Sequence, residues 1–232
     1  MNNREEAALK LEEVIGYQFN DKMLLIEALS HTSYTNERKL NKIKSYQRLE
    51  FLGDAVLEMF SSMSLFKAHP DFTEGMLTKA RASMVCEEAL AECARNIRLG
   101  DYILLGIGEN RSGGNSKDSI LSDVFEALIG AVFIDGGYER AHEFIQKYVI
   151  DFGASAQESY KTELQELIQA RDHNSEIEYE VVNVSGPEHN RSFTVRVLAD
   201  GKVLGNGTGG SKKEAENRAA QEAVKSLKGQ TD

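Results

Sequence analysis

The sequence has few cysteines, and the spacing between them argues against a disulfide. Cys86 and Cys93 are the only two among 232 residues. They fall seven positions apart in a helical pattern, which separates them by a rise of about 10 Å. A disulfide requires Cα atoms within about 7 Å of each other. We therefore expect two free thiols and a reducing compartment.

The sequence also predicts neither a targeting segment nor a membrane segment. The N-terminus, MNNREEAALKLEEV, does not have the basic-then-apolar order of a signal peptide. No apolar run reaches the roughly 20 residues that a membrane-spanning helix needs. The sequence predicts a soluble, cytoplasmic protein that has no membrane partner.

Basic residues are fewer than acidic residues, and the formal net charge is −10. Phosphate binding depends on Lys and Arg, so this value taken alone argues against a nucleic-acid partner. The acidity is concentrated toward the N-terminal part of the chain. A local basic cluster further along the chain therefore remains compatible with nucleic-acid binding.

The N-terminal part consists of helical patterns, because its apolar residues recur at spacings of three and four. These patterns cover residues 5–15, 21–30, 45–67, 73–80, 83–95, 118–134 and 138–150. They predict an all-α domain over residues 1–152. The small, polar and non-periodic stretch that follows predicts a linker at 153–160.

The pattern changes in the C-terminal part, which predicts an α+β domain over residues 161–230. Its expected elements are a helix at 161–170, strands at 177–184, 191–199 and 202–209, and a helix at 211–227. Asp200-Gly201 is typical of a two-residue hairpin turn. The order α-β-β-β-α describes a small sheet with two helices on one face, so the whole chain is expected to be a multidomain protein.

Carboxylates interrupt two strongly apolar helical segments. In QRLEFLGDAVLE, residues 47–58, Glu50 and Asp54 share one narrow sector of the helix. In ILSDVFEALIGAVFI, residues 120–134, Asp123 and Glu126 point the same way. No basic residue occurs between Lys117 and Arg140. Buried acids so close together raise one another's pKa unless a cation lies between them.

Three interpretations of the acids remain open. A salt bridge from a distant arginine is the first, and Arg81 is the obvious candidate. A di-iron carboxylate site is the second, but it requires Glu-x-x-His motifs, and neither Glu50 nor Glu126 has a histidine three residues on. The third interpretation is a Mg²⁺ or Mn²⁺ site, because these ions prefer oxygen ligands. Such a site suits phosphoryl-transfer chemistry.

The same residues resemble the ribonuclease III family. The segment 47–58 is similar to the signature of that family, and SILSDVFEALIGAVFID (119–135) is similar to its second acidic segment. TEGMLTKARASMV (73–85) and GIGENRSGG (106–114) resemble the helix and loop between them. The C-terminal part resembles a double-stranded-RNA-binding domain, so the resemblance covers nearly the whole chain.

This resemblance implies a homodimeric, Mg²⁺-dependent endoribonuclease that cuts duplex RNA to 5′-phosphate and 3′-hydroxyl ends, in processing of ribosomal precursor and other structured RNAs. Mn²⁺ is expected to substitute for Mg²⁺. It implies that Glu50, Asp123 and Glu126 hold the metal, and that Asp54 and Glu126 act in catalysis. Glu74 and Glu109 match further family acids that support the site.

Gln47 departs from the family pattern, which commonly has an acid at this position. An amide accepts a hydrogen bond but carries no negative charge. A protein that binds structured RNA without cutting it therefore remains the alternative to the enzyme.

The glycine-rich segment GNGTGGSKKEAE, residues 205–216, is not a nucleotide-binding loop, because Ser211-Lys212 reverses the required order. Ser211 and Glu214 form a capping box instead. This places Lys212 and Lys213 in the first helical turn, where the helix dipole disfavours cations. Two ammonium groups beside free backbone N–H groups predict a site for RNA phosphates.

The helix at 161–170 offers a second contact surface. Its apolar stripe leaves Thr162, Gln165 and Glu166 on the other face, and such groups suit the 2′-hydroxyls of the wide minor groove of A-form RNA. The family resemblance adds His189, in the loop 185–190, as a third contact. It also implies that RNA is recognised by shape, with its base sequence largely unread.

Overall fold

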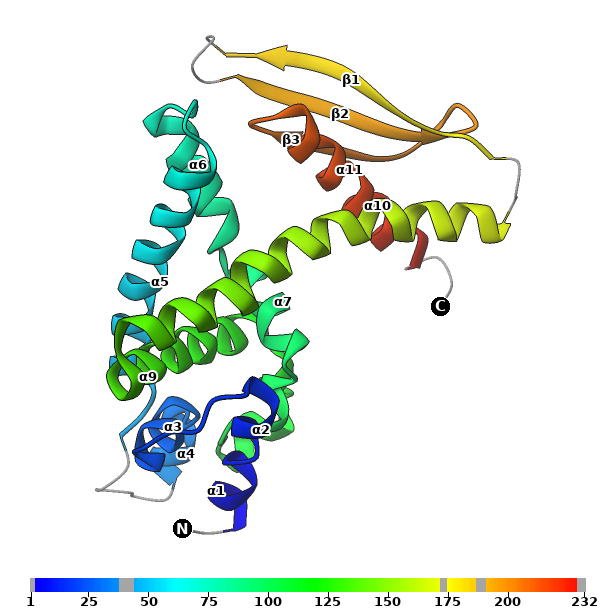
Figure 1. The fold of residues 1–232 in the computed structure, drawn as a ribbon. Coiled ribbons are helices and arrows are strands. Elements are labelled where there is room, and N and C mark those ends of the chain that lie inside the picture. Colours follow the sequence, from blue (N-terminus) through cyan, green and yellow to red (C-terminus); the bar gives the residue numbers. More distant parts are fainter. Residues whose placement is uncertain (1–2, 38–43, 172–174, 187–190, 229–232) are drawn as a thin grey trace. The chain divides into compact units, whose positions relative to one another are not determined.

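The structure is a computed structural model that describes residues 3–37, 44–171, 175–186 and 191–228. The chain divides into two compact units, Met1–Ala68 with Arg81–Gly153, and His69–Ala80 with Ala154–Asp232. Figure 1 shows helices from blue to green along the N-terminal part, followed by the three strands and a last helix in yellow to red.

Helices build the N-terminal part of the chain. Their bounds are α1 (Asn3–Ala8), α2 (Leu11–Ile15), α3 (Lys22–Ala28), α4 (Thr32–Glu37), α5 (Gln47–Ala68), α6 (Glu74–Met84), α7 (Glu87–Asn96), α8 (Ile107–Arg111) and α9 (Asp118–Ile145). Short 3-10 turns, η1 (Leu99–Asp101) and η2 (Gly114–Ser116), connect them, and a π-helix, η3 (Gln146–Asp151), follows α9. The all-α expectation is confirmed.

Helix α9 is the centre of the first hydrophobic core. Its segment between Val124 and Val132 contributes seven side chains that are fully shielded from solvent, among them Phe125 and Leu128. The helix is kinked at Gly137, which has φ of 75°. A helix that is apolar on nearly all sides has to be surrounded by other elements, so the position of α9 follows from its composition.

The second unit contains α10 (Phe152–Arg171), β1 (Ile177–Ser185), β2 (Ser192–Ala199), β3 (Lys202–Gly209) and α11 (Lys212–Lys228). The strands form one antiparallel sheet in the order β1-β2-β3. Ala199 pairs with Lys202, and the intervening Asp200 and Gly201 have φ of 50° and 77°. Positive φ at both central residues matches the expected hairpin turn. The predicted α+β architecture is confirmed.

The glycines of β3 allow α11 to approach the sheet. A Cβ atom at Gly205 or Gly207 would overlap backbone atoms of α11. The facing side of α11 carries small buried residues, including Ala215 and Ala219. The core is completed by apolar residues of α10 and β2: Leu164, Ile168, Val195 and Val197. The glycine-rich segment therefore serves helix–strand packing.

Three elements differ from the sequence expectation. The stretch expected as an irregular linker, 153–160, is part of α10. Alanine, glutamine and glutamate favour the helix there, and small polar composition alone does not exclude it. The short helices α4 and α8 were not predicted. With only six and five residues, they are too short to show helical periodicity.

Candidate functional site

Helix α5 presents two of the expected acids. The carbonyl oxygen of Tyr46 accepts hydrogen bonds from the backbone N–H groups of Leu49 (2.8 Å) and Glu50 (2.9 Å), and the helix begins there. Glu50 is half-buried and Asp54, one turn later, is exposed. Phe51, on the surface of α5, is 81% exposed, so this strongly apolar helix is not buried on all sides.

Two glycines bring the acidic helices α5 and α9 together. A Cβ atom at Gly53 would overlap the carbonyl oxygen of Glu126, and a Cβ atom at Gly130 would overlap that of Leu49. The two backbones are therefore in direct contact. This contact places Asp54, adjacent to Gly53, beside the helical turn that carries Glu126.

The acids of the two helices interact electrostatically. Burial and the charges of Asp54, Glu50, Asp123 and Glu58 raise the pKa of Glu126 to about 8. Burial, Asp123 and Asp54 likewise raise the pKa of Glu50. The structure thus brings together the four acids that the sequence singled out. It also adds Glu58, one helical turn after Asp54, whose charge raises the pKa of Glu126 and Asp54.

Arg81 does not neutralise this cluster. Its Nη1 atom donates to the Ser62 hydroxyl oxygen at 2.9 Å. Across the described ranges, Arg81 forms no ion pair with any of the four acids. Its charge lowers the pKa of Asp54, but burial and Glu58 outweigh it and leave that pKa raised. The salt-bridge interpretation therefore does not account for the acids.

Tyr46 is a site residue that the sequence did not reveal. Its hydroxyl group donates to Asp123 Oδ2 at 2.9 Å, and the side chain is only 4% exposed. Burial and the charges of Asp123, Glu50 and Glu109 raise its pKa, so the phenol stays protonated and remains a donor. The ring of His31 lies against it, with 5.7 Å between the centroids.

The two supporting acids have different surroundings. Glu109 on α8 pairs with Lys117 at 2.7 Å, and this hydrogen bond lowers the pKa of Glu109. Its charge also acts on Tyr46 and His31. Glu74 is exposed at the start of α6, within the second unit, and accepts a hydrogen bond from Thr78 at 3.1 Å.

The donor set fits a hard cation, because it consists of carboxylates, and none of the four forms an ion pair within the described ranges. Within the described part of the chain, no three His, Cys, Asp or Glu side chains converge into a complete metal cage. The acids are electrostatic neighbours whose side chains would have to turn toward a bound ion.

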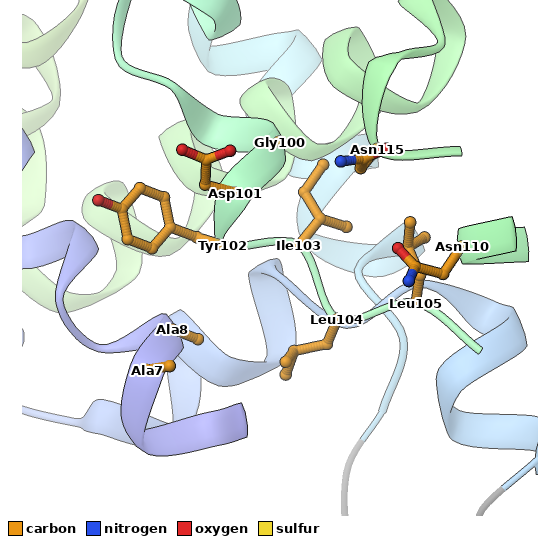
Figure 2. Close-up of a pocket in the computed structure, with 10 residues that line it drawn as sticks. All are labelled: Ala7, Ala8, Gly100, Asp101, Tyr102, Ile103, Leu104, Leu105, Asn110 and Asn115. Atoms are coloured by element: carbon orange, nitrogen blue, oxygen red, sulfur yellow. The ribbon is translucent and has the colours of Figure 1, made fainter. Parts of the chain in front are cut away.

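A cavity in the first unit, of about 340 Å³, is lined by none of these acids. Figure 2 shows that it lies beside α1 and the segment 100–105. Its lining residues are Ala7, Ala8, Gly100, Asp101, Tyr102, Ile103, Leu104, Leu105, Asn110 and Asn115. The four acids of α5 and α9 are therefore not part of this cavity.

The expected RNA contacts of the second unit lie on its surface. Thr162, Gln165 and Glu166 are exposed on α10, and Lys212 and Lys213 are exposed on the first turn of α11. His189 falls outside the described residues.

The expected cap of α11 is present with one change. The Glu214 N–H donates to the Ser211 hydroxyl oxygen at 3.2 Å. The Glu214 carboxylate accepts from the N–H of Gly210, at 2.7 Å, and not from that of Ser211. The start of the helix therefore lies where the sequence predicted it.

Comparison with known proteins assigns both parts of the chain. A family model described as Ribonuclease-III-like matches residues 21–152, and one described as double-stranded RNA binding motif matches residues 160–227. Proteins named Ribonuclease 3 are similar over nearly the whole chain. That of Listeria monocytogenes is 44% identical over 231 residues, covering 98% of this chain and 99% of its own. That of Bacillus cereus is 47% identical over 229 residues, covering 97% and 93%.

A solved structure supports the same assignment. The nuclease domain of ribonuclease III from Campylobacter jejuni superposes with a TM-score of 0.56 at 42% identity, covering 60% of this chain and 94% of that one. The chain belongs to the ribonuclease III family. It is an endoribonuclease that binds double-stranded RNA. This family is generally metal-dependent.

No helix in the described ranges combines the length and apolar character that crossing a bilayer requires.

Proposed function

We propose that the protein hydrolyses phosphodiester bonds of double-stranded RNA in a Mg²⁺-dependent reaction, which Mn²⁺ also supports, leaving 5′-phosphate and 3′-hydroxyl ends. In this proposal residues 1–152 form the catalytic domain and residues 161–230 form the RNA-binding domain. Residues 153–160 connect the two domains. The observation that carries this proposal is the concentration on α5 and α9 of four carboxylates that form no ion pair within the described residues. Burial and the neighbouring charges raise the pKa of Glu126 to about 8. Ribosomal precursors and other structured RNAs are the proposed substrates.

In this proposal Glu50, Asp123 and Glu126 would hold the metal. A bound Mg²⁺ supplies activation of the attacking water and charge stabilisation at the leaving oxygen. Asp54 is exposed, so its carboxylate can exchange a proton with solvent and with the leaving 3′ oxygen. Glu109 pairs with Lys117, and its charge contributes to the raised pKa of Tyr46. Glu74 remains a proposed supporting acid.

Incubation with long duplex RNA tests the reaction. We expect conversion to short duplexes with 5′-phosphate ends in Mg²⁺, and intact RNA when a chelator replaces the metal. Intact RNA in Mg²⁺, at protein concentrations that shift the duplex on a gel, would count against cleavage. Gln47 is exposed and accepts a hydrogen bond from Ser45 at 3.3 Å. The missing charge at this position therefore removes none of the four carboxylates of α5 and α9.

Tyr46→Phe is expected to weaken metal binding by about tenfold, the lower end of what losing a hydrogen bond to a metal ligand costs. The variant loses only the bond to Asp123, and the ring still fills its buried position. Titration of the purified protein with Mn²⁺, followed by calorimetry, measures the change. Tyr34→Phe is the matched control, because Tyr34 is also buried and donates to a carboxylate, that of Glu5, at 3.0 Å. Equal Mn²⁺ affinities of the two variants would exclude this role of Tyr46.

Replacing both Lys212 and Lys213 with alanine is expected to weaken binding to every duplex, whatever its sequence. Loss of two phosphate contacts also reduces the steepness of the salt dependence by about two. Fluorescence anisotropy in chelator over a series of salt concentrations measures both quantities. Lys225→Ala, in the last turn of the same helix, is the control. An unchanged salt slope would argue against the phosphate role.

The homodimer is part of the proposal. Phe51 is 81% exposed and Met59 is 40% exposed on α5, and a partner subunit would cover such apolar surface. The structure of the Campylobacter nuclease domain is described with a region involved in dimer formation in that protein. Sedimentation equilibrium tests this state. The cytoplasmic location is also proposed, and the two free cysteines are compatible with it.

A further inference from the structure

An acidic side chain lies within the proposed RNA-binding surface. Glu216 is one turn into α11, behind Lys212, and its side chain is 17% exposed. Its Oε2 atom lies 2.7 Å from Nζ of Lys161, on α10. Its Oε1 atom lies 3.8 Å from Nζ of Lys212. One carboxylate thus connects ammonium groups from both helices that carry the proposed RNA contacts.

Lys161 is held from a second side as well. Its Nζ atom lies 4.8 Å from the centroid of the Tyr179 ring, within the range of a cation–π contact. Burial and the charge of Glu216 raise the pKa of Tyr179 to about 12, so this ring stays neutral. The ammonium group of Lys161 therefore has a defined position although the side chain is long and flexible.

The position of Lys161 continues the polar stripe of α10. Lys161, Gln165 and Gln169 follow at intervals of four residues, which places them on one helix face. Together with Tyr179 they line a pocket of about 270 Å³. Gln165 is a proposed contact to RNA 2′-hydroxyls. Lys161 thus connects that stripe, through Glu216, to Lys212 of α11.

We infer that Lys161 is a further contact to RNA phosphates and that Glu216 is a positioning residue, which fixes the ammonium groups of Lys161 and Lys212 for the duplex. The inference rests on the proposed RNA-binding surface. An ordered ammonium group loses less conformational freedom when the duplex binds. The paired charge of Lys161 at 2.7 Å offsets the repulsion between Glu216 and phosphate.

The direction in which one substitution changes the affinity for RNA separates this role from simple electrostatics. Glu216→Gln makes the surface more positive by one charge, so electrostatics alone predicts tighter binding and a steeper salt dependence. Positioning predicts the reverse, a loss of roughly three- to tenfold, the cost of ordering one long side chain at an interface. The salt slope should become flatter by about one as the Lys161 contact is lost.

Glu163→Gln is the matched control. Glu163 pairs with Lys228 at 2.6 Å and so also joins α10 to α11. Its replacement changes the net charge by the same amount without touching Lys161 or Lys212. Thermal unfolding of both variants checks that the fold is retained. We expect wild-type affinity for Glu163→Gln.

The measurement uses the full chain, in chelator, with a duplex RNA of about 20 base pairs, longer than the roughly 16 that one such domain spans. Weaker binding by Glu216→Gln alone supports the inference, as does a smaller loss when Glu216→Gln is added to Lys161→Met than when it is made in the wild-type chain. Equal or tighter binding by Glu216→Gln overturns it, and so does an equal loss in both glutamine variants. Failure of the wild-type chain to bind the duplex would instead contradict the proposed surface.

Discussion

Glu126→Gln is expected to slow cleavage of duplex RNA by about 10²- to 10⁴-fold, the range for losing one positioned acid–base group. The substitution keeps the shape of the side chain and removes its charge, so the metal would lose one carboxylate ligand. RNA binding in chelator should stay near normal, because the RNA contacts proposed in residues 161–230 are unchanged. Single-turnover cleavage assays and anisotropy measure the two quantities separately.

The same substitution is expected to stabilise the protein in chelator at pH 8. The pKa of Glu126 is raised from 4.5 to about 8 in the folded chain. The carboxyl group is protonated in both folded and unfolded states at low pH, so stability is complete there. As the pH rises toward 8, the unfolded chain releases this proton first and the folded state loses stability. Glutamine does not ionise and avoids that loss, about 2 kcal/mol after allowance for solvent screening.

Thermal unfolding at pH 5 and pH 8 measures this effect, and the variant's advantage should appear mainly at pH 8. Glu139→Gln, an exposed acid on the same helix, is the control and should change neither activity nor stability. A parallel loss of RNA binding in Glu126→Gln would mean that Glu126 has a structural role.

Gly53→Ala is expected to destabilise the protein by about 3 kcal/mol, the upper part of the usual range for overpacking a core. The added methyl group would meet the carbonyl oxygen of Glu126, and backbone cannot turn away as a flexible side chain does. The two acidic helices would have to separate. Cleavage and metal binding should therefore fall together with stability.

Urea unfolding in chelator measures the stability change. Gly108→Ala, on α8, is the matched control, because a Cβ atom there would have no atom within 4 Å. Alanine is the better helix former, so this variant should be as stable as the wild type or slightly more stable. Equal stability of the two variants would mean that α5 and α9 tolerate a wider spacing.

Much of the fold could be predicted from periodicity and turn chemistry. The apolar character of α9 indicated a central helix, and Asp200-Gly201 indicated the hairpin between β2 and β3. The short helices and the helical form of 153–160 could not be predicted, because too few periodic residues distinguish them. A tertiary contact lies at the start of α4, where the backbone N–H of the preceding residue, His31, donates to the carbonyl oxygen of Leu104 at 3.0 Å.

The candidate site was predictable where helical spacing alone places residues together. Glu50 and Asp54 are about one helical turn apart, and so are Asp123 and Glu126. Each pair is therefore expected on one face of its helix. The pairing of these two helices depends on Gly53 and Gly130, and only Gly53 stands out beside the acids in sequence. Tyr46 and Glu216 act across elements distant in the chain, so no local pattern identifies them.

If Glu126 binds the metal as proposed, its raised pKa makes a proton and a metal ion competitors for this carboxylate. Below about pH 8, each metal ion that uses this ligand has to displace a proton. The apparent affinity for the metal then falls by about tenfold for each pH unit of acidification. With the proposed Mg²⁺ dependence, a fall in pH and a fall in free Mg²⁺ would therefore both reduce cleavage while RNA remains bound.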